Sequence, residues 1–118
     1  MQFLFSKGTA ITMHPIRLLY TIEKEEAGIF SNGLLQAGVG APSRQFRKAV
    51  QRNKVKRLLR EGYRLEKPNF TNSISITNTR LNLFFLYVDA HVQTQQQIQA
   101  TIKLLLQKLA DKLKSTIV

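Results

Sequence analysis

The sequence predicts an α+β domain in which a single mixed sheet has helices packed on one face. Short apolar and β-branched runs, typical of strands, occur in both halves of the chain, and two longer stretches show the three- and four-residue apolar spacing of helices. These segments interleave without the strict strand–helix alternation of a parallel sheet. With 118 residues the chain can bury one core, so residues 1–118 are expected to form a single domain.

The first elements expected are a helix end, a strand and a turn. Met1–Gly8 is apolar and aromatic and then breaks at glycine, as the last turns of a helix do. Residues 17–22 alternate little but are rich in leucine, tyrosine and isoleucine, which favours a strand. Glu23–Gly28 is then expected to be an acidic turn.

A second strand region and a long basic helix follow. Residues 29–39 are expected to contain one or two short strands, with Asn32-Gly33 as a hairpin-type turn signal and Leu34–Val39 as the better strand. A helix is predicted from about 46 to 66. Proline disfavours the helical conformation of the residue before it, so Pro68 is expected to stop this helix.

The last third of the chain predicts a loop, a central strand and a final helix. Residues 69–82 are rich in Asn, Ser and Thr and favour a loop, to which Ile74 and Ile76 could add a short strand. Residues 83–88 are apolar throughout, which predicts a central strand buried on both faces. A helix is expected over residues 94–114. Its apolar positions are Ile98, Ile102, Leu105, Leu109 and Leu113.

The positive charge of the chain is concentrated in the basic helix and its lead-in. The formal net charge is +11, and nine of the 18 Lys and Arg residues lie between Arg44 and Arg64, where Glu61 is the one acid. At 100° per residue one side of this helix is aliphatic and the other is cationic. The aliphatic side holds Val55, Leu58, Leu59 and Gly62, and the cationic side holds Arg52, Asn53, Lys56, Arg57, Arg60 and Arg64.

Such a helix has one face for a core and one for a polyanion. Nucleic acid is the partner that a domain of this charge favours, and an anionic membrane surface is the alternative. A solvated helix face would alternate in sign to gain pairs along the helix, whereas here Glu61 alone can pair, for example with Lys54, Arg57 or Arg64. Asn53 can both accept and donate hydrogen bonds, and Arg offers a planar fork to phosphate.

Other functional classes find little support in the residues. The chain has no cysteine, which excludes disulfides and thiol chemistry. No apolar run reaches the ~18 residues that a membrane span needs, and no secretory signal is evident, so a soluble cytoplasmic protein is expected. His14 and His91 have no partner at the spacing of a metal site or a catalytic triad. No catalytic residue and no metal ligand is therefore predicted in this chain.

The run from Ala49 to Glu61 closely resembles the signature of the bacterial ribonuclease P protein subunit. That signature reads Arg-Asn-Arg, a β-branched residue, Lys-Arg and, three residues on, Arg followed by Glu or Gln; here only Lys54 replaces an Arg. Gly40–Lys48 and Phe3–Gly8 resemble the segments that the family has before this helix and at the end of its first helix. The chain departs from the family at Gln2, where a further aromatic is usual, and at Arg44 to Arg47, where two Lys and a Gly are usual.

The resemblance implies a fold and a function. The family is the small protein partner of a catalytic RNA, and the complex removes the 5′ leader of precursor tRNA. The RNA subunit would hold the catalytic Mg²⁺ ions and carry the chemistry. The implied fold is ferredoxin-like, as in the second domain of ribosomal protein S5, with a left-handed βαβ crossover. The protein alone is expected to be a monomer.

Two groups of candidate site residues follow. The RNA subunit is expected to be bound by Arg52, Asn53, Lys54, Lys56, Arg57 and Arg60. The leader is expected to be bound by Phe5, Tyr20, Arg44, Phe46 and Lys48. Aromatic rings stack on bases of any sequence, which suits a variable leader. Phe5 and Phe46 could instead be ordinary core residues.

Two other functions remain open from the residues. One is a non-catalytic ribosomal or ribosome-assembly protein of similar fold that binds ribosomal RNA. The other is a membrane-binding or calmodulin-target helix, which requires the aliphatic face of residues 46–66 to be exposed.

Overall fold

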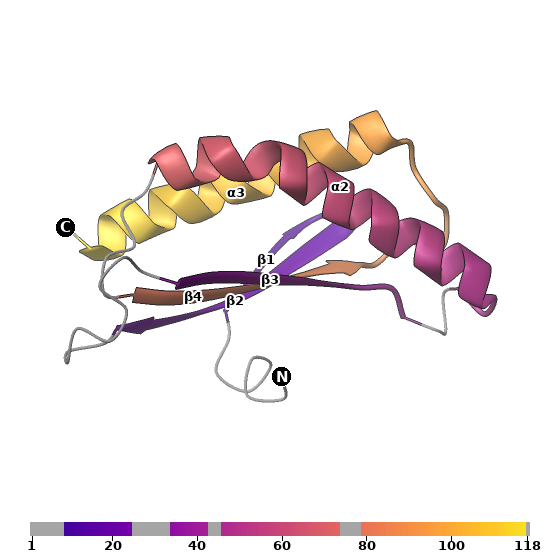
Figure 1. Cartoon of the computed structure of the whole chain (residues 1–118), viewed down its shortest axis with the longest axis horizontal. Helices are drawn as coiled ribbons and strands as arrows, with labels where there is room; N and C mark the ends of the chain where they lie inside the picture. The colour runs from indigo at the N-terminus through magenta and orange to yellow at the C-terminus, as the bar shows by residue number, and fades with distance from the viewer. Residues whose placement is uncertain (1–8, 25–33, 43–45, 74–78, 118) are drawn as a thin grey trace.

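The computed structural model describes residues 9–24, 34–42, 46–73 and 79–117, which form four strands and two helices (Figure 1). The order along the chain alternates only in part, as expected for an α+β protein. The elements are β1 Thr9–Met13, β2 Ile16–Lys24, β3 Leu34–Gly40, α2 Ala49–Ser73, β4 Thr79–Tyr87 and α3 Gln95–Ile117.

The four strands make one mixed sheet in the order β1-β2-β4-β3. β1 pairs antiparallel with β2, β2 pairs antiparallel with β4, and β3 pairs parallel with β4. Helix α2 therefore connects two parallel neighbours, β3 and β4, which is a βαβ unit. The left-handedness expected for this crossover stays a prediction.

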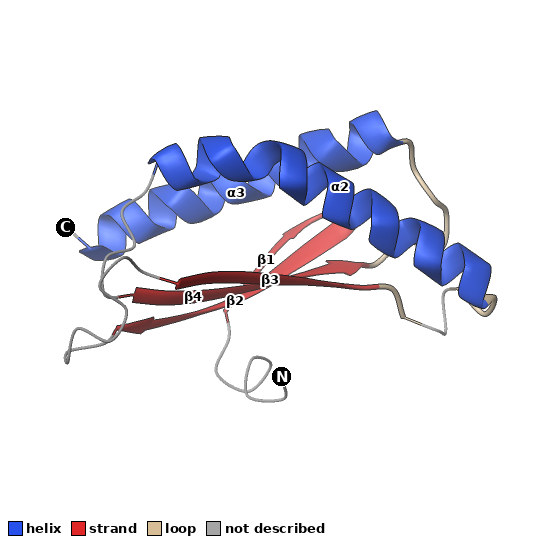
Figure 2. Ribbon diagram, viewed as in Figure 1, coloured by secondary structure: helices blue, strands red, loops and turns tan. Residues whose placement is uncertain are grey.

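Both helices cover the same face of the sheet (Figure 2), which confirms the predicted class. Side chains alternate between the faces of a strand. In the two central strands, Leu18 and Phe85 are fully buried opposite each other beneath the helices. On the other face of β4, Phe84 and Leu86 are only half-buried. The prediction that β4 is buried on both faces is therefore wrong, because both described helices lie on one side.

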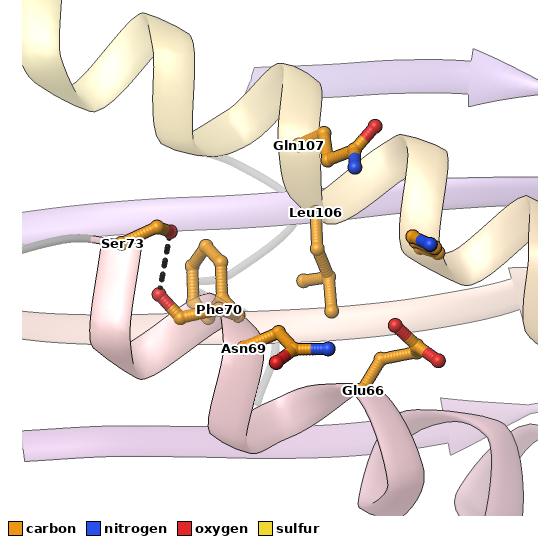
Figure 3. A pocket seen from close by; sticks show the side chains of 7 residues that line it. Glu66, Asn69, Phe70, Ser73, Leu106 and Gln107 are labelled. Atoms are coloured by element: carbon orange, nitrogen blue, oxygen red, sulfur yellow. Dashed lines mark hydrogen bonds between the residues drawn. The ribbon is translucent and has the colours of Figure 1, made fainter.

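Helix α2 runs through Pro68, and the prediction that this proline ends it is wrong. Proline inside a helix costs about 3 kcal/mol through a lost hydrogen bond and a steric clash. The last turns nevertheless bury Phe70, which is 3% exposed (Figure 3). Full burial of such a side chain stabilises the fold by about 1.5–3 kcal/mol. The Thr71 hydroxyl also donates to the carbonyl oxygens of Lys67 and Pro68, both at 3.1 Å, which satisfies acceptors near the helix end.

Helices α2 and α3 pack closely at a glycine. A Cβ atom on Gly62 would lie 2.8 Å from Cδ1 of the buried Ile102, so only glycine fits this contact without a shift. About one helical turn further along α2, Gln99 Nε2 of α3 donates to Oε2 of the buried Glu66 at 2.8 Å. These two contacts hold the long basic helix against α3 and fix which of its faces points outward.

Helix α3 begins with a reciprocal cap. The backbone N–H of Gln97 donates to Thr94 Oγ1 at 3.2 Å, and the backbone N–H of Thr94 donates to Gln97 Oε1 at 3.1 Å. The predicted helix over residues 94–114 is confirmed, and Ile98 and Ile102 are fully buried as its spacing predicted.

Several smaller expectations need correction. β1 was not expected, Glu23 and Lys24 belong to β2 rather than to a turn, and the segment expected as a loop over residues 69–82 holds the end of α2 and the start of β4. The predicted strands at 17–22, 34–39 and 83–88 are confirmed, except that β4 ends at Tyr87. The following expectations lie outside the described residues: the helix end Met1–Gly8, the turn after Lys24, the turn Asn32-Gly33, and Ile74 with Ile76.

Candidate nucleic-acid interface

The outward face of α2 carries a set of exposed polar and basic side chains, which we call the α2 ridge. The ridge consists of Asn53, Lys54, Arg57 and Arg60, all exposed, with the partly exposed Lys56 on its flank. Together with Val50, the four exposed side chains line a shallow depression. The opposite face of the helix buries Val55, Leu59 and Gly62, so the predicted two-sided helix is confirmed.

The cations of the ridge are not neutralised within the described part of the molecule. Among the described residues the ion pairs are His14–Asp89 and Arg64–Glu61, and neither involves the ridge. No hydrogen bond from Lys54, Arg57 or Arg60 to another described residue is present either. Their donors are therefore available to an external anion.

Glu61 pairs with Arg64, which is one of the partners expected from the sequence. Arg64 Nε donates to Glu61 Oε2 at 3.0 Å. The hydrogen bond from Arg64 lowers the pKa of Glu61, and the same bond raises the pKa of Arg64. Glu61, the acid that lies beside the ridge, is therefore paired with Arg64 and not with Lys54 or Arg57.

Arg52 is not counted in the ridge because its guanidinium forms hydrogen bonds within the protein. Its Nη1 donates to the backbone oxygens of Phe46 and Arg47, each at 2.8 Å. These two carbonyls belong to the segment that leads into α2. The side chain is only partly exposed and ties the lead-in segment to the first turn of the helix.

The structure places the five candidate leader residues very differently. Lys48 is exposed immediately before the first residue of α2. Tyr20 is 7% exposed on the helix-covered face of the sheet, and Phe46 is 2% exposed, with its ring centroid 5.8 Å from that of Tyr87. Because both rings are buried, neither can stack on a base in this structure. Phe46 is a core residue, which was the alternative considered for it. The expectation that Tyr20 stacks on the leader is corrected, since Tyr20 is also part of the core. Phe5 and Arg44 lie outside the described residues.

One exposed basic residue of α2, Lys67, was not predicted from the sequence pattern. Lys67 is exposed on a turn that follows the expected helix end at 66, so it was assigned to no face. The signal was present, because Phe70 continues the apolar stripe of Val55, Leu59 and Gly62 at helical spacing past the proline.

The remaining acids and histidines form no metal centre in the part of the chain that the structure describes, where no group of three or more His, Asp or Glu side chains comes together. His14 Nε2 lies 3.2 Å from Asp89 Oδ2. The pKa of Asp89 is lowered, first by the backbone N–H of His91 and also by His14. Neither described helix is long and apolar enough to cross a membrane.

The described aliphatic face of α2 also decides one alternative. A membrane or calmodulin-target helix needs this face to be free, yet Val55 and Leu59 are fully buried against the rest of the domain. The face that remains exposed is the cationic one, which fits a polyanion.

Comparison with known proteins gives consistent matches. The family model described as Ribonuclease P matches residues 1–113. Ribonuclease P protein components from two strains of Porphyromonas gingivalis are each 28% identical to this chain over 112 residues, which is 95% of this chain and 79% of the relative.

Solved structures share the fold. The RNase P protein of Staphylococcus aureus superposes with a TM-score of 0.62 at 20% identity, over 92% of this chain and 86% of that one. The RNase P protein of Thermotoga maritima also gives a TM-score of 0.62, at 17% identity, over 91% of this chain and 88% of that one.

Proposed function

The chain belongs to the bacterial ribonuclease P protein family, and from this premise we propose that it binds the RNA subunit through the α2 ridge and the 5′ leader of precursor tRNA through neighbouring residues. As a ribonuclease P protein component it takes part in tRNA processing. The proposal adds which surface of the molecule meets which RNA.

The unneutralised ridge is the observation that carries this proposal. Lys54, Arg57 and Arg60 project from a rigid helix and have no partner among the described residues. Each phosphate that a cation neutralises adds about 0.7 to 0.9 to the magnitude of the slope of log K against log salt, the values for single strands and for B-form DNA. With Lys56 included, four such contacts would give a slope of magnitude about 3 to 4.

Arg52 and Asn53 have different roles in this proposal. Asn53 is exposed and can bridge two phosphate or ribose groups, since its amide both donates and accepts. Arg52 positions the ridge rather than binding RNA with its whole guanidinium, because one nitrogen already bonds two backbone carbonyls. These bonds also fix the position of the backbone next to Lys48, the exposed residue that we propose contacts the leader.

We also propose that the RNA subunit carries the catalysis and holds the Mg²⁺ ions. The ridge supports this division because Lys, Arg and Asn are suited to phosphate and ribose, whereas Mg²⁺ is bound mainly through carboxylates, phosphates and water. Phe5 and Arg44 remain proposed leader contacts. The protein is further proposed to act as a monomer in the cytoplasm.

Reconstitution tests this function. The protein is added to the RNA subunit with precursor tRNA at low, physiological Mg²⁺, and leader removal is followed on a gel. We expect cleavage to be restored, and we expect no cleavage by the protein alone. A cleavage rate that added protein leaves unchanged would refute the proposed function, and tighter binding to ribosomal RNA in competition would point to a ribosomal role instead.

A further inference from the structure

A second basic surface lies where α2 passes over the edge of the sheet. A groove of ≈ 280 Å³ opens between β3 and α2. One wall is the strand between Leu35 and Val39, and the other wall is formed by Arg60, Tyr63 and Lys67. Among the described residues, no acidic side chain lines this groove. None of the described leader candidates, Tyr20, Phe46 and Lys48, lines it.

The strand that forms one wall, β3, lies at an edge of the sheet. β3 lies last in the strand order and pairs with β4 on one side, and no described segment pairs with its other side. Natural proteins usually protect such an edge with a charged residue or a proline, and the sequence of β3, Leu-Leu-Gln-Ala-Gly-Val-Gly, has neither. Its outer backbone groups can therefore bond to an added partner.

The two cations of the groove select an anionic partner. Arg60 and Lys67 are both exposed, and neither makes an ion pair with another described residue. They are seven residues apart, or two helical turns, which places them on the same side of α2 at ~10.5 Å along its axis. A chain with regularly spaced negative charges can contact both at once.

Tyr63 adds a hydrogen-bond donor between these cations. Its ring is half-buried and packs on Phe85 with centroids 5.4 Å apart, so its position is fixed. Burial raises the pKa of Tyr63 to about 12, which keeps the hydroxyl protonated at neutral pH. No described residue bonds to this hydroxyl, which leaves it free to donate to a phosphate or a ribose.

The groove is continuous with the α2 ridge, because Arg60 lines both the ridge depression and the groove. We propose that a single-stranded segment of RNA leaves the ridge at Arg60 and runs along the free edge of β3 to Lys67. Its phosphates contact the two cations, and its sugars or bases contact the β3 backbone and the Tyr63 hydroxyl. This proposal rests on the proposed function and extends it to a surface beside the ridge.

An acidic peptide that adds a strand to β3 is the competing occupant. RNA is favoured because the groove shares Arg60 with the ridge and because its second cation follows two turns later on the same helix. A peptide partner would need no such continuity.

The experiment compares single variants in a binding assay with a salt series. Lys67→Ala removes one cation, and Lys108→Ala on α3 is the matched control, since Lys108 is exposed and lines neither the groove nor the ridge. Lys67→Ala is expected to lower the magnitude of the salt slope by about 0.7, the value for a single-strand phosphate contact. Tyr63→Phe keeps the packed ring and is expected to weaken binding roughly threefold through the lost hydroxyl.

Two arms identify the source of the strand. In the first arm the ligand is the RNA subunit alone, and in the second it is precursor tRNA or mature tRNA bound to the holoenzyme. Loss in the first arm supports a strand of the RNA subunit, and loss for precursor but not mature tRNA supports the leader.

The outcomes also separate this inference from the proposed function. If Lys67→Ala and Tyr63→Phe match Lys108→Ala in both arms while Arg57→Ala weakens RNA binding, the groove proposal is overturned and the proposed function stands. If Arg57→Ala also has no effect, both fail. Slower amide exchange of β3 with an acidic peptide but not with RNA would likewise overturn the groove proposal.

Discussion

Arg52 and Arg57 belong to the same basic helix, yet the structure predicts that alanine at Arg52 lowers the stability and alanine at Arg57 weakens RNA binding. Arg52 Nη1 bonds two backbone carbonyls at 2.8 Å, whereas Arg57 is exposed and bonds no described residue. A hydrogen bond to a charged group contributes about 1.5–3 kcal/mol when well shielded. Because Arg52 is partly exposed, we expect its two bonds together to contribute about 2 kcal/mol, near the lower limit for one shielded bond.

The assay measures stability and RNA binding for each variant. Arg52→Ala should lower the free energy of unfolding in urea by about 2 kcal/mol and leave the salt slope for the RNA subunit nearly unchanged. Arg57→Ala should leave the free energy of unfolding within about 0.5 kcal/mol and lower the magnitude of the slope by about 0.9. Arg52→Lys keeps the charge but not the planar fork, so it should lose part of the stability.

A different pattern would refute this reasoning. If Arg52→Ala left the stability unchanged and lowered the slope as much as Arg57→Ala does, Arg52 would be an RNA ligand and its internal bonds would contribute little. Comparing the two variants in both measurements separates the roles, since a general loss of folding would affect stability and not the number of released counterions.

Two further predictions concern the helix that carries the ridge. Pro68→Ala should raise the free energy of unfolding by about 1–2 kcal/mol, because the ring is exposed and alanine restores the missing backbone donor; unchanged or lower stability in urea would contradict the interpretation of a tolerated helix break. Glu61 has a lowered pKa, so its stabilising effect is present at neutral pH and is lost as the pH falls below its ordinary value of 4.5. Thermal unfolding of Glu61→Gln should therefore differ from that of the unaltered protein at neutral pH and converge with it in acid, and a difference that persisted at low pH would exclude the ion pair as its cause.

The two-sided character of α2 could be predicted from the sequence because helical geometry alone sorts its residues. Val55 and Leu59 recur at a four-residue step, and both are fully buried, while Arg57 falls on the far side and is exposed. Local periodicity contains this information, and no tertiary contact needs to be known.

The orientation of β2 could not be predicted in the same way. Leu18 and Leu19 are adjacent and both apolar, so the pattern does not say which face of the strand is covered. Pairing of Tyr20 with Leu83 of the distant strand β4 settles it, and this pairing places Tyr20 under the helices. A residue chosen for its ring chemistry therefore proved to be part of the core.

The length of α2 depends on distant contacts as well. Pro68 is a sound local signal for a helix end, but burial of Phe70 and the two hydrogen bonds from the Thr71 hydroxyl together offset the cost of the proline, and the helix continues past it. The expected helix end therefore fell one residue before Lys67, which was missed as a result.

The position of β4 has a consequence for how the protein is made. β4 is the last strand along the chain, yet it lies in the sheet between β2 and β3. Its contacts with β2 span a long stretch of sequence, as in the Asn82–Thr21 hydrogen bond between residues 61 apart. A nascent chain that has just released α2 from the ribosome therefore still lacks β4, the strand that joins β2 to β3 in the sheet. Its cationic helix emerges before the core that supports it is complete. The folded domain can bind RNA only after synthesis has passed residue 87.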